Sequence, residues 1–201
     1  MSKIEPDISC VICHHRGELI YKCIDSIKQS TNVSYEIVVI TSDSDLALKG
    51  IEGCNVQYSE SMPAEKRNIG VDLSKGYYIA FFDDDVEVSP DCLSHLRMTL
   101  ASDKHLGMVY GKLWNMERRN RFDEAGGFIT NTGFIWSRAG QNDIDSGQYD
   151  KPCYILAGKS ASCMVKRDVF NEVKGFDESF EILGEETDLS WRIWLSCHTI
   201  V

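Results

Sequence analysis

The hydrophobic and polar positions of the first half of the chain change their period from block to block. Short apolar runs, rich in β-branched and aromatic residues, predict three buried strands and a weaker one, at residues 8–13, 35–40, 77–82 and 56–58. Between these runs, residues 18–29 and 63–73 place apolar side chains at helical spacing. This alternation favours an α/β fold with a mostly parallel sheet and helices on its faces.

The second half of the chain is less regular. A helix is predicted at residues 90–100 and a strand at 107–113, and then the apolar periodicity weakens from 115 to 152, where glycines punctuate the chain. We expect this stretch to be an ordered binding loop. Regular structure returns in four segments: 153–157, 162–165, a short helix at 168–173 and a final helix at 187–196.

Polar residues follow three of the predicted strands, at 13–16, 41–45 and 83–85. In open parallel sheets the ligand binds beyond the carboxyl ends of the strands. These strand ends are therefore candidate site positions, and we expect His14 and Asp43 to contribute to the site.

The third strand end is the run Asp83, Asp84 and Asp85. Burying three adjacent carboxylates without compensation is costly, and like charges this close raise one another's pKa. A hard divalent cation, Mg²⁺ or Mn²⁺, relieves both problems because it binds carboxylate and phosphate oxygens. The alternative is a solvated acidic loop in which Asp84 or Asp85 caps a turn.

A second acidic cluster, Glu185, Glu186 and Asp188, crowds the first turn of the final helix. One interpretation is a general base that deprotonates an acceptor hydroxyl. The other is structural, because acidic residues at a helix N-terminus interact favourably with the helix dipole.

A basic cluster lies in the helix predicted at 63–73. The Arg67 guanidinium is suited to bind a diphosphate, and Asn68 is suited to orient a ribose or a neighbouring loop. The alternative is a charged helix face that is simply solvated.

Length and charge limit the function classes. The 201 residues suffice for one α/β domain with a sizeable core, and are too few for two comfortable ones. The formal net charge of -10 argues against broad binding to nucleic acid, which depends on Lys and Arg neutralising phosphates. We expect no signal peptide at residues 1–6 and no membrane-spanning run, so that any membrane contact is peripheral.

Eight cysteines are scattered along the chain. Cys10 and Cys13 have CxxC spacing, but no second pair follows, so a four-thiolate zinc site is unsupported. A redox CxxC usually opens a helix, whereas Cys10 lies inside a predicted strand. We expect reduced, mostly buried thiols and a cytoplasmic protein, with any peripheral membrane association at the inner face.

Six segments stand in order along the chain: 8–12, 35–40, 66–70, 76–85, 175–178 and 185–189. Together they resemble the inverting glycosyltransferases of family 2, which have the GT-A fold. The first two resemble the family's first strands, the third its A-R-N-x-G helix, and the fourth its strand leading into the DXD motif. The last two resemble its G-G-F-D-E and E-D-x-D-L motifs, so the match covers nearly the whole chain.

The resemblance implies metal-dependent transfer of a sugar from a UDP-, GDP- or dTDP-linked donor to a hydroxyl of a glycan or lipid-linked acceptor. It assigns the metal, Mg²⁺ or Mn²⁺, to Asp83 and Asp85, with Asp85 as the direct ligand. The residues assigned to donor binding are His14, Asp43, Arg67, Asn68, Asp83, Asp84 and Asp85.

The resemblance further implies that Glu186 is the catalytic base. Thr41 and Ser42 stand where the family often has an aspartate beside the base, so Glu185 and Asp188 stay open as alternatives. On the acceptor side we expect Trp191 and Gly158. A buried helix tryptophan is the other interpretation of Trp191.

The resemblance also implies a single GT-A domain over residues 1–201. Its donor half is 1–113 and its acceptor and catalytic half is 114–201. The family continues with further strands and often with a histidine that completes the metal site, so we expect the second half to be incomplete.

Two other function classes compete with the enzyme. A non-catalytic sugar-nucleotide or glycan-binding module of the same fold carries the same motifs. A nucleotidyltransferase is also α/β and metal-dependent, but it usually opens with a Gly-rich, basic loop after the first strand, and here only Gly17 lies in that place.

Overall fold

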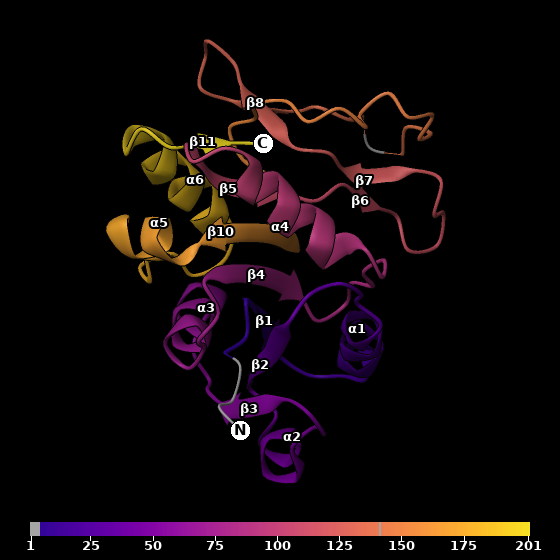
Figure 1. Ribbon diagram of the computed structural model, residues 1–201, viewed down its shortest axis with the longest axis vertical. Helices are drawn as coiled ribbons and strands as arrows, with labels where there is room; N and C mark the ends of the chain where they lie inside the picture. The colour runs from indigo at the N-terminus through magenta and orange to yellow at the C-terminus, as the bar shows by residue number, and fades with distance from the viewer. Residues whose placement is uncertain (1–4, 141) are drawn as a thin grey trace.

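A seven-stranded sheet forms the centre of the computed structural model, which describes residues 5–140 and 142–201 (Figure 1). The expectation about a signal peptide at the start of the chain concerns residues that lie largely outside this range. The strand order is β11-β5-β10-β4-β1-β2-β3. The strands are β1 (Ile8–His14), β2 (Tyr35–Thr41), β3 (Asn55–Tyr58), β4 (Tyr78–Asp83), β5 (Leu106–Tyr110), β10 (Ser162–Lys166) and β11 (Thr199–Ile200).

Most neighbouring strands of this sheet are parallel. β1 pairs in parallel with β2 and β4, β2 with β3, and β5 with β11. β10 is the exception, because it lies antiparallel to both β4 and β5. The prediction of a mostly parallel sheet in an α/β fold is therefore confirmed.

Helices cover both faces of the sheet (Figure 1). Side chains of α1 (Leu19–Lys28), α2 (Ser44–Lys49) and α4 (Cys92–Ser102) share one buried cluster with Ile12 and Phe82. Side chains of α3 (Pro63–Asp72), α5 (Arg167–Glu172) and α6 (Glu185–Leu195) share the other with Val11 and Phe81. Because successive residues of a strand point to opposite faces, strands buried on both faces read as the continuous apolar runs seen in the sequence.

Two small hairpins occupy much of the segment expected to be an ordered loop. β6 (Leu113–Trp114) pairs with β7 (Phe122–Glu124), and β8 (Gly127–Ile129) pairs with β9 (Ile135–Ser137). A third, much smaller core anchors them, made of Phe122, Ala125 and Ala139 with Tyr149 packed against it. These hairpins lie beyond the β5 end of the main sheet (Figure 1).

Several local details differ from the sequence-based expectations. The strand expected at 107–113 ends at Tyr110, and the chain restarts pairing in β6. The segment 153–157 is irregular, with an isolated bridge between Ala157 and Gly127. Neither α2 nor β11 was expected, since each is short and has no periodicity long enough to detect.

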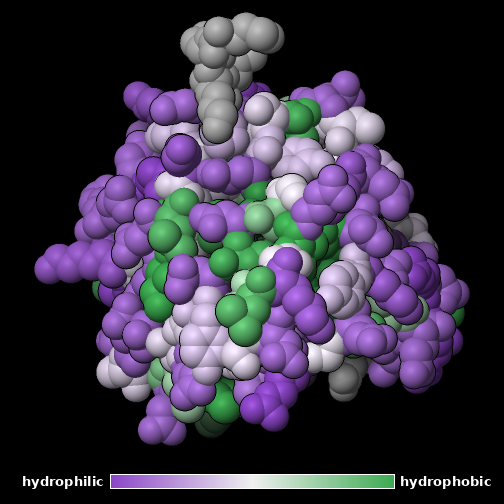
Figure 2. All heavy atoms as spheres, turned by 90° about the horizontal axis from the view of Figure 1, so that it is seen from below, coloured by the Kyte–Doolittle hydropathy of each residue, from purple (hydrophilic) through white to green (hydrophobic). Residues whose placement is uncertain are grey.

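Within the described ranges, no helix is long and apolar enough to cross a bilayer. Seen from the end of the sheet where β3 and α2 lie, the surface is largely hydrophilic with apolar side chains gathered near its middle (Figure 2). All eight cysteines are free, but only Cys10, Cys23 and Cys163 are buried, so the expectation of mostly buried thiols is met in part; Cys197 is exposed and the other four are half-buried.

Candidate active site

The carboxyl ends of β1, β2 and β4 meet at one edge of the sheet because these three strands are adjacent and parallel. Lys66, a buried residue of α3, ties two of the ends together. Its Nζ donates to the carbonyl oxygen of His14 at 3.0 Å and to Oγ of Ser42 at 2.6 Å. The structure thus brings together the strand ends that the sequence marked as candidate positions.

The three adjacent aspartates have three different environments. Asp83 forms an ion pair with Arg67, with 3.2 Å between Oδ1 and Nη2. Asp84 accepts a hydrogen bond from the backbone N–H of His15 at 3.4 Å, and its Oδ2 lies 3.8 Å from Nε2 of His14. Asp85 is exposed, and within the described ranges its carboxylate makes no hydrogen bond or ion pair. Asp85 is therefore the member of the run that is available to a ligand.

Burial raises the pKa of both Asp83 and Asp84, although Arg67 and His14 respectively act in the opposite direction. A carboxylate with a raised pKa is one whose charged form is incompletely compensated by its surroundings. The charge at this strand end is therefore only partly balanced by the protein's own cations.

Arg67 connects the aspartates to the helix that carries the acidic cluster. It is only 5% exposed, and its Nη1 lies 2.8 Å from Oε1 of Glu185, while Nη2 reaches Asp83. Its guanidinium also lies over the Phe176 ring, 5.4 Å from the centroid. The expected binding of Arg67 to a diphosphate stays a prediction, because in this structure both terminal nitrogens contact carboxylates.

The three acidic residues of α6 are held differently. Glu185 is buried, and its second oxygen, Oε2, has no hydrogen-bond partner in the described part of the chain. Asp188 pairs with Arg192 at 2.6 Å, and Arg192 also donates to the carbonyl oxygens of Val173 and Gly175. Glu185 and Asp188 are thus each paired with an arginine.

Glu186 is the remaining carboxylate of this cluster. Burial raises its pKa, a backbone hydrogen bond lowers it, and the neighbouring Glu185 raises it again, with a net increase. A carboxylate with a pKa moved toward neutrality is a better proton acceptor at the pH where it is still ionised. These properties suit Glu186 to act as a general base.

Asn68 holds the segment that precedes α6. Its Nδ2 donates to the carbonyl oxygen of Phe176 and to Glu178, each at 2.9 Å, and its Oδ1 accepts from the Phe176 N–H at 2.9 Å. Gly175 adopts a φ of +66°, and a Cβ there would lie 2.7 Å from Oδ1 of Asn68. Of the two roles expected for Asn68, these contacts correspond to the orientation of a neighbouring loop.

His14 and Asp43 are fixed by local contacts. The His14 ring contacts Oγ1 of Thr41 through Nδ1 at 2.8 Å and the carbonyl oxygen of Gly17 through Nε2 at 3.2 Å. Asp43 caps α2 by accepting from the N–H groups of Asp45 and Leu46. His14 borders Asp84, whereas Asp43 has a structural role at the end of β2, and donor binding by either stays a prediction.

A cleft of about 490 Å³ opens beside the aspartates. Asp83 and Asp85 line one side of it, and β6, β7 and the loop between them line the other. This second side was not predicted from the sequence, although a polar and aromatic run directly follows the predicted strand 107–113. Its side chains include Lys112, Trp114, Asn115, Arg119, Asp123 and Lys159.

The residues expected on the acceptor side lie elsewhere. Trp191 is 43% exposed and lines a separate apolar hollow with Phe128 and Tyr154. Gly158 packs against Tyr110, and a Cβ at this position would lie 2.7 Å from the tyrosine ring. The structure brings neither of them to the cleft beside the aspartates, so their acceptor roles stay predictions.

The donor set at the cleft fits a hard divalent cation only in part. Within the described ranges, no group of three or more His, Cys, Asp or Glu side chains is placed to hold a metal ion. Asp83 and Asp85 nevertheless supply carboxylate oxygens at the cleft, and Mg²⁺ commonly binds one or two carboxylates plus the phosphates of a substrate. The residues present therefore fit a metal that arrives with a diphosphate.

The fold, a mostly parallel α/β sheet with carboxylates at the end of β4, is GT-A. It is similar to the mannosyltransferase PcManGT from Pyrobaculum calidifontis in complex with GDP-Man and Mn²⁺, with a TM-score of 0.67, 14% identity, and coverage of 99% of this chain and 55% of that one. It is also similar to S. aureus TarS 1–349, with a TM-score of 0.67, 15% identity, and coverage of 97% and 58%.

Residues 9–174 match the family described as Glycosyl transferase family 2, and the chain belongs to this family. A curated relative, Glycosyltransferase GlyG of Streptococcus pneumoniae serotype 4, is 23% identical over 186 residues. The alignment covers 83% of this chain and 58% of the relative, so the chain spans little more than half of that protein's length.

Proposed function

We propose that the protein transfers a sugar from a nucleoside diphosphate donor to a hydroxyl acceptor, with inversion at the anomeric carbon. The observation that carries this proposal is the Arg67 bridge, which ties Asp83 at the end of β4 to Glu185 at the start of α6. Through this bridge a candidate donor site and a candidate base share one edge of the sheet. Family membership and the GDP-Man complex of a fold relative support a nucleotide-sugar donor.

In this proposal Asp85 and Asp83 would hold Mg²⁺ or Mn²⁺ together with the donor diphosphate, with Asp85 as the direct ligand. The metal, when bound, supplies positive charge that stabilises the departing nucleoside diphosphate. Arg67 keeps Asp83 oriented and neutralises part of its charge. His14 and the His15 N–H hold Asp84, which fixes the direction of the loop that carries Asp85.

Glu186 is the proposed base. It takes the proton of the acceptor hydroxyl as that oxygen attacks the anomeric carbon, while the bond from this carbon to the diphosphate breaks. The attack comes from the side opposite the leaving group, so the configuration inverts. Glu185 and Asp188 are less suited because each pairs with an arginine.

The second candidate is a non-catalytic sugar-nucleotide-binding module of the same fold. This candidate stays in the test because the chain matches little more than half the length of its relatives, and the match does not cover the rest of those proteins. We propose the donor half as residues 1–113 and the acceptor and catalytic half as 114–201. Eight free cysteines support a reducing compartment, and we propose the cytoplasm, with a glycan or lipid-linked acceptor at the membrane face.

A thermal-shift panel tests the donor site. UDP, GDP, dTDP and their common sugar conjugates are each added with and without Mn²⁺. A ligand that binds the native state raises its apparent stability, so we expect one nucleotide series to raise Tm only when Mn²⁺ is present. No shift with any series would overturn the donor site, and a metal-dependent shift without transfer or donor hydrolysis would favour the binding module.

A further inference from the structure

The indole of Trp114 stands on the cleft that contains Asp83 and Asp85. It is 44% exposed, although tryptophan is the largest side chain and is usually mostly buried. The apolar side chains of Val86 and Met116 line the same cleft. Contact between an exposed aromatic ring and water is unfavourable, and a ligand with an apolar face that covers the ring removes this contact.

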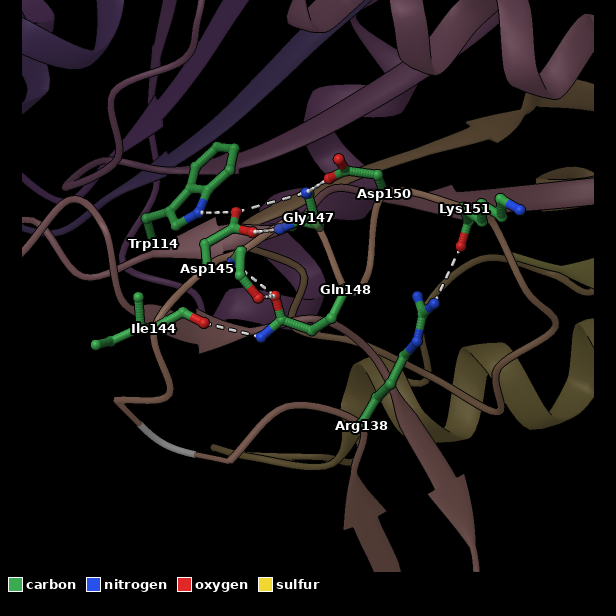
Figure 3. A network of polar contacts seen from close by, with 10 residues as sticks. Trp114, Arg138, Ile144, Asp145, Gly147, Gln148, Asp150 and Lys151 are labelled. Atoms are coloured by element: carbon green, nitrogen blue, oxygen red, sulfur yellow. Dashed lines mark hydrogen bonds and ion pairs between the residues drawn. The ribbon is translucent and has the colours of Figure 1, made fainter.

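Several contacts fix the ring before any ligand arrives. Its Nε1–H donates to Oδ2 of Asp145 at 2.8 Å, and Oδ1 of Asp145 accepts from the Gly147 N–H at 2.9 Å (Figure 3). The Gly147 N–H lowers the pKa of Asp145, so that this carboxylate stays ionised as an acceptor. The indole therefore has a partner for its only polar atom without using the cleft.

Lys112 holds the ring from a second direction. Its Nζ lies over the indole, 5.3 Å from the ring centroid, and is itself fixed by Asp150 at 2.5 Å and by Asp145 at 3.6 Å. Lys112 lines the same cleft and takes up one face of the indole, so a stacked ligand would use the other face. Because the ammonium is neutralised by carboxylates, it adds little net charge to the cleft.

The β6–β7 hairpin, which carries Trp114, is anchored by a small hydrophobic core. Trp114 pairs with Phe122 across β6 and β7, and Phe122 is fully buried in its own small core. The segment 142–151 supplies Asp145 and Asp150 (Figure 3), and its Tyr149 packs against this core. The irregular stretch therefore supplies the two carboxylates that fix the Trp114 ring and the Lys112 ammonium beside it.

We propose that Trp114 is the sugar-binding platform of the cleft, on which the C–H face of a hexopyranose ring stacks. The polar side chains of Asn115, Asp123 and Lys159 line the same cleft and match the hydroxyl groups at the edge of such a ring. Trp191, which the sequence suggested for this role, lines a different hollow made almost entirely of apolar side chains. The inference rests on the proposed function, and the ring belongs either to the donor or to the acceptor.

The experiment compares each nucleoside diphosphate with its sugar conjugate, using GDP with GDP-mannose and UDP with UDP-glucose, all with Mn²⁺. Affinities are measured by calorimetry for the wild type, Trp114→Ala, Trp114→Phe and Trp136→Ala, the last a control at an exposed indole that does not line the cleft. We expect Trp114→Ala to lower the affinity for the sugar conjugate by about tenfold or more and to leave the affinity for the nucleoside diphosphate unchanged. Trp114→Phe should retain part of the affinity that the indole adds, and Trp136→Ala should behave as wild type.

A second set of ligands identifies the source of the ring. Methyl α-glucoside, mannoside and galactoside are titrated at millimolar concentration against the same four proteins. If the loss in Trp114→Ala appears for a glycoside and not for the conjugates, the platform binds the acceptor sugar. Equal affinities of wild type and Trp114→Ala for every conjugate and glycoside would overturn the inference. Failure of the wild type to bind any nucleoside diphosphate would instead count against the donor site.

Discussion

Arg67 and Glu185 are 118 positions apart in the sequence and meet in a buried ion pair of 2.8 Å. The same guanidinium contacts Asp83, so one side chain of α3 joins the end of β4 to the start of α6. A planar guanidinium with two terminal nitrogens can serve two carboxylates at once, which a lysine ammonium cannot do with the same geometry.

Removing this bridge should destabilise the fold strongly. Arg67→Met leaves the buried carboxylate of Glu185 and the partly exposed carboxylate of Asp83 without their cation. Because the Glu185 charge is then buried and unpaired, we expect a loss of about 3–5 kcal/mol in the free energy of unfolding. Urea denaturation at pH 7 measures it. Arg119→Met is the matched control, because the Arg119–Glu87 pair is 2.8 Å long but its arginine is 66% exposed, and we expect a loss below about 1 kcal/mol. Similar losses in both variants would contradict the proposed role of Arg67.

Asp85→Asn should abolish metal-dependent donor binding and leave the fold intact. Asp85 is exposed, so we expect its replacement to change the free energy of unfolding by no more than about 0.5 kcal/mol. Calorimetry in Mn²⁺ should show an affinity for the nucleoside diphosphate that is lower by roughly 10- to 100-fold or more, since even the outer partners of a metal site have effects of that size. Glu87→Gln, on the same cleft, is the control and should bind normally. An unchanged affinity in Asp85→Asn would remove this residue from the metal site.

Glu186→Gln should keep donor binding and lose transfer. Loss of a general base typically slows catalysis by about 10²–10⁴-fold, and the amide cannot accept the proton. The measurement is single-turnover transfer in a form of the protein with demonstrated activity, alongside donor affinity by calorimetry. Wild-type turnover in this variant would assign the base to Glu185 or Asp188.

The same variant should also change how stability depends on pH. Because the pKa of Glu186 is raised in the folded protein, the folded state binds its proton more tightly than the unfolded chain does. Stability therefore falls as pH rises from the unfolded carboxyl pKa, about 4.3, through the higher folded value. Glu186→Gln lacks this loss, so it should be more stable than wild type at pH 8, with the gain disappearing below about pH 4. A gain that does not vary between pH 4 and pH 8 would contradict the raised pKa.

Much of the sheet could be predicted because its strands are buried on both faces and read as continuous apolar runs. The run Tyr78–Asp83 is the clearest case, and its polar end lies at the same edge of the sheet as the ends of β1 and β2. The hairpins from 113 to 137 were not predictable, because their core depends on Phe122 and two alanines and leaves no periodic pattern.

The candidate site divides along similar lines. Strand-end positions such as Asp85 follow from the parallel topology alone. The partners of Arg67 and Asn68 do not, because each is set by side-chain geometry across elements far apart in the sequence. Trp114 was missed because a single aromatic residue after a strand is indistinguishable from a core position until its exposure is known.

The antiparallel insertion of β10 between β4 and β5 has a consequence for biosynthesis. During translation β4 is completed at Asp83, but the strand that covers its open edge begins only at Ser162, 79 positions later. At typical elongation rates of 5–20 residues per second, the interval is about 4–16 s. Throughout that time the open edge of β4 has no partner strand in the ribosome-bound nascent chain. This interval is therefore the stage at which chaperone binding is most useful, because it would cover the unpaired edge.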